Sequence, residues 1–187
     1  MDIFKKRSTA FIILIICAIV ATVIGVRSSL AEQADKIEDV FYNGSVNQTE
    51  SIYFQLNECK NATMNVITIT AEDPDFSEIT DELRDSRNDL VTAMENRDIT
   101  AMYLAYMQLD KSFTRFSQAA SKGVSSSNAD QLSGELSRFE NAQRVISQST
   151  YNNTVSEYER TVLRAFPVSI LKAVAHADTP AFFGVEG

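Results

Sequence analysis

An uncharged, apolar run near the start of the chain limits what this protein can fold into more than any other feature. Residues 8–26 read STAFIILIICAIVATVIGV and include no Asp, Glu, Lys, Arg or His. As an α-helix, 19 residues extend about 28 Å, close to the hydrocarbon thickness of a bilayer. The run therefore predicts one transmembrane helix, preceded by a short segment of residues 1–7.

Basic residues flank this run unequally. KKR occupies residues 5–7 before it, whereas only Arg27 follows it closely. By the positive-inside rule, residues 1–7 lie in the cytoplasm and the chain after residue 26 lies outside the cell membrane. A cleaved signal peptide is the alternative, because Ser29 and Ala31 fit the small-residue positions before a cleavage site. The run is longer than the roughly 7 to 15 apolar residues of a signal peptide, which favours an uncleaved signal anchor in a single-pass protein.

The remaining chain predicts an all-α fold. Its 187 residues include only six Gly and three Pro, so few residues are available for turns. Apolar side chains recur at steps of three and four, the spacing that places them on one face of a helix. Short connections between such helices are typical of an antiparallel, up-and-down bundle. The breaks between helices are expected within residues 42–51, 72–76, 95–98 and 121–128.

We therefore expect the transmembrane helix to continue into a bundle of four to five long helices over residues 27–171, with a C-terminal tail over residues 172–187. A coiled-coil dimer is the competing arrangement, but helices joined by short loops can cover one another within one chain. Nothing in the sequence indicates a homo-oligomer. The last helix is expected to run without interruption from about Asp130 to Ala165.

The segment TYNNTVSEYERTVLRAFP, residues 150–167, places aromatic or β-branched side chains at steps of three and four residues. Such a stripe lies on one face of a helix and must be buried against other helices. The proline that follows cannot continue the helix and predicts its end. The stripe consists of Tyr151, Val155, Tyr158, Val162 and Phe166, and the terminating residue is Pro167.

The same segment resembles the C-terminal signature of the LemA family, a Tyr-Asn and hydrophobic pattern that runs into Phe-Pro. A second, shorter match lies in QLNECKNATMNVI, residues 55–67, although Met64 replaces the family's usual proline and Glu159 replaces an asparagine of the C-terminal signature. The resemblance implies a divergent, bacterial member with an N-terminal hydrophobic segment, a long-helix antiparallel bundle and no established reaction. The matching residues are Gln55, Leu56, Asn65, Val66, Tyr151, Asn152, Val155, Tyr158, Val162, Phe166 and Pro167.

Motifs for catalysis and metal binding are missing from the sequence. One histidine, His176, and two cysteines, Cys17 and Cys59, provide too few ligands for a zinc or iron site. EDPDFSEITDELRD, residues 72–85, lacks the glycine and glutamate positions of a calcium loop, so its acids fit a helix N-terminus better. We expect no cofactor, no metal and no enzymatic activity. The net charge of -8 disfavours nucleic acid as a partner.

Some polar and aromatic residues allow two interpretations each. Asn65 and Asn152 can fix helix register through a shared hydrogen-bond network, or each can cap a helix or face solvent. Phe182 and Phe183 in the tail can dock onto a partner or the membrane, or can pack back on the bundle. The aromatic residues within 103–116 can line a ligand cavity, although their spacing is more typical of a helical core.

These features together predict a non-enzymatic, single-pass membrane protein at the cell envelope. Its bundle would act as a binding or scaffolding surface for a protein partner that the sequence does not identify. An extracytoplasmic sensor or ligand-binding bundle is the alternative, and a pocket with a bound apolar ligand would favour it. An enzyme would require a cleft with clustered titratable groups, for which no motif is present.

Overall fold

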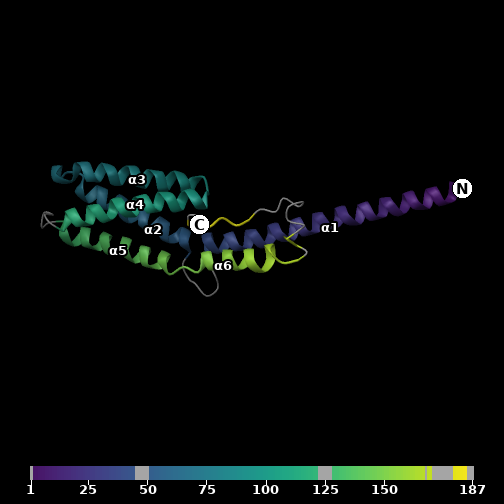
Figure 1. Cartoon of the computed structure of the whole chain (residues 1–187). Helices are drawn as coiled ribbons and strands as arrows, with labels where there is room; N and C mark the ends of the chain where they lie inside the picture. The colour runs from purple at the N-terminus through teal and green to yellow at the C-terminus, as the bar shows by residue number, and fades with distance from the viewer. Residues whose placement is uncertain (1, 45–50, 122–127, 167, 170–178, 185–187) are drawn as a thin grey trace. The chain divides into compact units, whose positions relative to one another are not determined.

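The computed structural model describes residues 2–44, 51–121, 128–166, 168–169 and 179–184 (Figure 1). Within these residues every regular element is helical, which confirms the predicted all-α class. The chain divides into two compact units, Met1–Glu38 with Asn153–Pro180 and Asp39–Asn152 with Ala181–Gly187. In chain order the elements are α1 (Asp2–Asn43), α2 (Ile52–Thr70), η1 (Pro74–Phe76), α3 (Ser77–Glu95), α4 (Ile99–Ala120), α5 (Ala129–Ser147), α6 (Tyr151–Tyr158) and η2 (Glu159–Leu163).

Helix α1 begins with the apolar run and continues to Asn43 as one helix of 42 residues. It is the one helix in the described part of the chain that is long and apolar enough to cross a membrane. Apart from the half-buried Val23, its large apolar side chains from Phe11 to Ile24 have exposed fractions between 43% and 65%. Water would solvate such a surface poorly, because every exposed apolar area costs free energy.

The first unit buries the segment of α1 that follows the apolar run. Leu30, Tyr158 and Leu163 form its core, and four half-buried apolar side chains pack around them. The Tyr158 Oη donates a hydrogen bond to the Leu30 carbonyl oxygen at 3.2 Å, so this buried hydroxyl has a partner. The surrounding side chains are Val26, Ile37, Val162 and Val168.

The prediction of one uninterrupted helix from Asp130 to Ala165 is wrong. Helix α5 ends at Ser147, and α6 begins at Tyr151 after a short break. Within the break the Ser149 hydroxyl accepts a hydrogen bond from the Tyr151 backbone N–H at 3.3 Å. A serine side chain that bonds to the nearby backbone competes with the helical pattern and favours an interruption.

A π-helical turn, η2, corrects a second prediction. The Arg164 N–H donates to the Glu159 carbonyl oxygen at 3.1 Å, a bond that spans five residues instead of four. The wider turn inserts one extra residue, so Leu163 takes the buried position that the sequence pattern assigned to Val162. Phe166 leaves the predicted buried stripe for the same reason and is 82% exposed. Pro167 lies outside the described residues.

The second unit is built on α2, α3, α4 and α5, which lie side by side in Figure 1. Between α3 and α4, the Ser86 and Ser112 hydroxyls hydrogen-bond at 2.9 Å, and Arg115 forms an ion pair with Glu82 at 2.6 Å. Residue numbers rise along α3 while they fall along α4 at these contacts, so the two helices are antiparallel. Small serine side chains at the seam allow this close approach of the two backbones.

Helices α2 and α5 form the other close pair. Arg138 donates from Nε and Nη2 to the two carboxylate oxygens of Glu58, at 2.7 and 3.1 Å. At the next residue of α5, the Phe139 ring stacks on the Phe113 ring of α4, with centroids 3.6 Å apart. The four helices therefore form the predicted up-and-down bundle.

Candidate functional site

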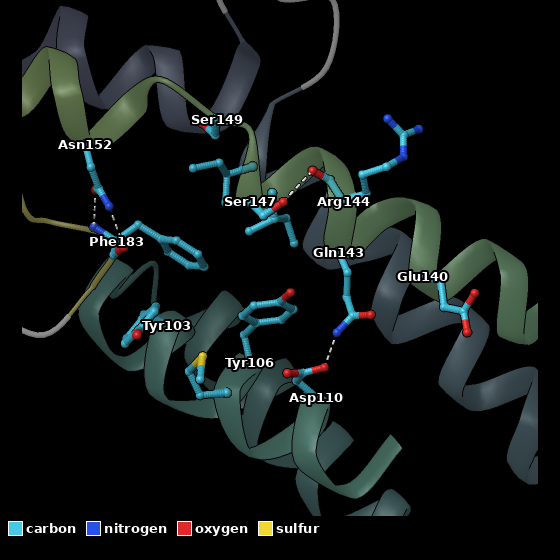
Figure 2. A pocket seen from close by; sticks show the side chains of 13 residues that line it. Tyr103, Tyr106, Asp110, Glu140, Gln143, Arg144, Ser147, Ser149, Asn152 and Phe183 are labelled. Atoms are coloured by element: carbon cyan, nitrogen blue, oxygen red, sulfur yellow. Dashed lines mark hydrogen bonds between the residues drawn. The ribbon is translucent and has the colours of Figure 1, made fainter. Parts of the chain in front are cut away.

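An open groove of about 660 Å³ runs along the α4–α5 side of the bundle (Figure 2). It lies wholly within the second unit. Helix α4 contributes Tyr103, Tyr106, Met107 and Asp110; α5 contributes Glu140, Gln143, Arg144, Ile146 and Ser147; the remaining lining residues are Ile52, Ser149, Asn152 and Phe183.

One end of the groove is closed by a segment of the chain's own C-terminal region. The Phe183 ring is only 6% exposed and contacts three other aromatic rings. Its centroid lies 5.5 Å from that of Phe41, 5.3 Å from that of Tyr103 and 6.1 Å from that of Tyr106. Edge-on and tilted contacts of this kind add to the stabilisation from burial alone.

The main chain of this segment is held by the Tyr-Asn pair at the start of α6. Asn152 Nδ2 donates to the Phe183 carbonyl oxygen at 2.8 Å, and the Phe183 N–H donates to Asn152 Oδ1 at 3.0 Å. The Tyr151 hydroxyl donates to the Ala181 carbonyl oxygen at 2.7 Å. The Asn152 amide thus hydrogen-bonds to both the backbone N–H and the backbone carbonyl of Phe183, as a neighbouring β-strand would.

These contacts decide between the alternatives left open by the sequence. Asn65 is exposed on α2, which agrees with the alternative of a side chain that faces solvent. Asn152 instead binds a segment about thirty residues further along the chain. Phe183 packs back on the bundle and is not free to dock onto a partner, while Phe182 is half-buried.

Asp110 lies on the floor of the groove and accepts a hydrogen bond from Gln143 Nε2 (Figure 2). Burial raises the pKa of the Asp110 carboxyl above its usual range. Within the described part of the chain this carboxylate forms no ion pair, and Figure 2 shows the Arg144 guanidinium pointing away from it. The hydrogen-bond partner of this partly exposed carboxylate is therefore a neutral amide.

Two further titratable groups lie near this carboxylate. Burial raises the pKa of Tyr106, and the nearby Cys59 and Asp110 raise it further. Burial, with Asp110 and Glu58 adding, raises the pKa of the Cys59 thiol to about 12. Both groups are therefore protonated at neutral pH, and neither supplies an anionic nucleophile.

Most of the residues singled out by the sequence serve the core instead of the groove. Of the signature residues, only Asn152 lines it. The exposed acids of residues 72–85 form no cluster with metal-ligand geometry among the described side chains, and His176 lies outside them. Gln55, Leu56, Val66, Tyr151, Val155 and Tyr158 are buried, and Val162 is half-buried.

Sequence reasoning assigned no functional role to Asp110 or to Gln143. A signal was present, because Asp110 follows Tyr106 by one helical turn and Gln143 occupies a position where the pattern expects an apolar residue. Polar residues on facing stripes indicate a hydrogen bond across a helix pair.

The fold and the groove define a helical-bundle protein with an N-terminal helix able to cross a membrane. In comparisons with known proteins, no family model matches the chain, and neither a curated protein nor a solved structure is similar to it. The resemblance to the LemA family therefore stays a prediction from its motifs.

We predict that Asn152→Ala releases the C-terminal segment. The Phe183 N–H loses its acceptor, so hydrogen exchange at this amide should accelerate by at least tenfold, the factor expected for losing about 1.4 kcal/mol of protection. Hydrogen exchange resolved by NMR measures the effect. Asn153→Ala, at an exposed neighbouring position, is the control and should leave the exchange rate unchanged. Equal rates in both variants would contradict this role of Asn152.

We also predict that Asp110→Asn stabilises the bundle at pH 7. Because the folded-state pKa of Asp110 is raised, its contribution to stability is fully present below the unfolded-state pKa and is lost as pH rises through the folded-state pKa. The asparagine keeps an oxygen for Gln143 and carries no charge. Its melting temperature should exceed that of the natural protein at pH 7, and the difference should shrink towards pH 3, below the ordinary value of 3.8.

Thermal unfolding followed by circular dichroism measures this difference at each pH. Asp89→Asn, on the exposed face of α3, removes the same charge and serves as the control. A stabilisation of Asp110→Asn that does not vary with pH would show that burial of the carboxylate is not its cause.

Proposed function

We propose that this protein is a non-enzymatic, single-pass membrane protein that holds its helical bundle outside the cell membrane as a binding surface. The groove between α4 and α5 is the contact site, and its partner is a protein segment that carries a positively charged side chain. The observation that carries this proposal is the Phe183 segment, because one end of the groove already holds an extended peptide by its main chain.

The anchoring part of the proposal is supported by α1. Its apolar side chains are exposed in the described structure and would be covered by lipid. The basic residues 5–7 on one side of the run, against Arg27 alone on the other, favour a cytoplasmic N-terminus. The LemA resemblance implies the same architecture, and membership of that family is part of the proposal.

The partner's charge is inferred from the groove lining. Asp110 and Glu140 provide carboxylates, and Tyr103, Tyr106 and Phe183 provide aromatic rings. Carboxylates beside aromatic faces attract an ammonium or guanidinium group through Coulomb and cation–π interactions. A lysine or arginine side chain of the partner would also form an ion pair with Asp110. A small cationic ligand is the second candidate, since about 660 Å³ is within the size range of small-molecule pockets.

We predict that Leu104→Cys reacts with a membrane-impermeant maleimide on intact cells when Cys17 is replaced by serine. Leu104 is 56% exposed on α4, whereas the native Cys59 is fully buried and its thiol stays protonated. Cys59 therefore adds no background, and for the same reason it cannot itself report topology. A cysteine at Asp2 is the control and should react only after the cells are opened by detergent. Labelling of Leu104→Cys only after opening would reverse the proposed orientation.

We further predict that a photo-crosslinking amino acid at Met107 captures the partner in intact membranes. Met64 on α2 is the matched control, because the two side chains are 45% and 46% exposed and only Met107 lines the groove. The captured protein, once purified, should bind the natural bundle and should bind Asp110→Asn more weakly, although that variant is the more stable one. Equal capture at Met64, or undiminished binding by Asp110→Asn, would remove the groove from the proposal.

A further inference from the structure

Phe166 is the most exposed of the large apolar side chains in the described part of the chain, at 82%. It follows the π turn η2 of the first unit, whose extra residue moves it off the buried face. Exposure of a phenyl ring to water costs free energy. That free energy is recovered when the ring contacts an apolar environment.

The core of the first unit shows which part of α1 lies level with the Phe166 ring. Val168, two residues beyond Phe166, packs against the cluster of Leu30 and Leu163, and Val26 packs against the same cluster. Val26 is the last residue of the uncharged run. Phe166 therefore lies beside the point at which α1 leaves the hydrocarbon, if residues 8–26 span the bilayer.

The charged residues nearest to Val26 and Phe166 in the sequence are arginines. Arg160 and Arg164 are the only charged residues within 160–169, and Arg27 is the only one within 8–31. All three are exposed. The acids closest to them in sequence are Glu159, which is half-buried, and Glu32 further along α1. These three arginines, called the arginine collar below, contrast in sign with the net charge of -8 of the whole chain.

We propose that Phe166 and the collar of Arg27, Arg160 and Arg164 form a second contact with the membrane. The Phe166 ring enters the interfacial layer of the bilayer, where aromatic side chains are enriched. The arginines bind the phosphates of anionic lipid headgroups, for which their planar donor groups are suited. This inference rests on the proposed function, because it requires α1 to cross the same bilayer.

A tryptophan at this position tests the inference directly, since the chain contains no Trp of its own. The full chain with Phe166→Trp is reconstituted into vesicles of phosphatidylcholine, with or without phosphatidylglycerol, whose acyl chains carry bromine as a quencher. Phe54→Trp, at a 49% exposed position of α2 in the second unit, is the control. Bromine should quench the fluorescence at position 166 several-fold more strongly than at position 54, and the emission at 166 should be blue-shifted.

The arginines are tested in the same protein. Phosphatidylglycerol should increase the quenching at position 166, and adding Arg160→Gln and Arg164→Gln should abolish that increase without changing the quenching in phosphatidylcholine alone. Quenching that is indifferent to phosphatidylglycerol would remove anionic lipid from the inference.

Flotation of the vesicles separates failure of the inference from failure of the proposed function. If the protein floats with the vesicles and resists alkaline extraction, but aqueous iodide quenches positions 166 and 54 equally, the second contact is wrong and the membrane anchor stands. If the protein does not enter the vesicles, both are wrong. Strong bromine quenching at position 166 alone supports both.

Discussion

The last helical part of the chain must bury side chains whose spacing does not fit an α-helix. Ile146 and Tyr151 are buried five residues apart, and so are Tyr158 and Leu163. At about 100° per residue, a step of five turns a side chain about 140° away from the starting face. An ideal helix cannot bury both members of either pair against one core. Both interruptions of the final helix fall at these two steps.

The backbone accommodates the two five-residue steps differently, by a helix break at the first and by a π turn at the second. Each change places a side chain at a proposed contact site. Between Ile146 and Tyr151 the helix stops, and Ser149 bonds to the chain that starts α6. The break leaves Asn152 at the end of the groove, where it holds the Phe183 main chain. Between Tyr158 and Leu163 the helix continues through a π turn, which buries Leu163 and exposes Phe166. Insertions of this type often mark functional positions in helices.

The sequence predicts those parts of the fold that depend on local periodicity. Steps of three and four residues along α2 and α4 identify buried residues such as Leu56, Val66 and Leu109. The groove is harder to predict, because Asn152 finds its partner only after the chain returns at Phe183. The burial of Asp110 likewise depends on how closely α5 packs against α4. The shift from Val162 to Leu163 also escapes the pattern, since a period of 3.6 residues has no place for a π turn.

The two proposed contacts have opposite charge: the groove is suited to a cationic side chain, and the arginine collar is suited to anionic lipid. A chain of net charge -8 is repelled by an anionic membrane and attracted to cationic groups. The groove agrees with this overall sign, because its carboxylates suit a positively charged side chain. The arginine collar opposes it and can act only at short range, since salt screens charges beyond about 8 Å at physiological ionic strength. In the proposed arrangement, three arginines therefore cannot bring the protein to the membrane, but they would hold a surface that α1 had already placed there. The proposed anchor would act first, and the arginine collar would then favour anionic lipid around it.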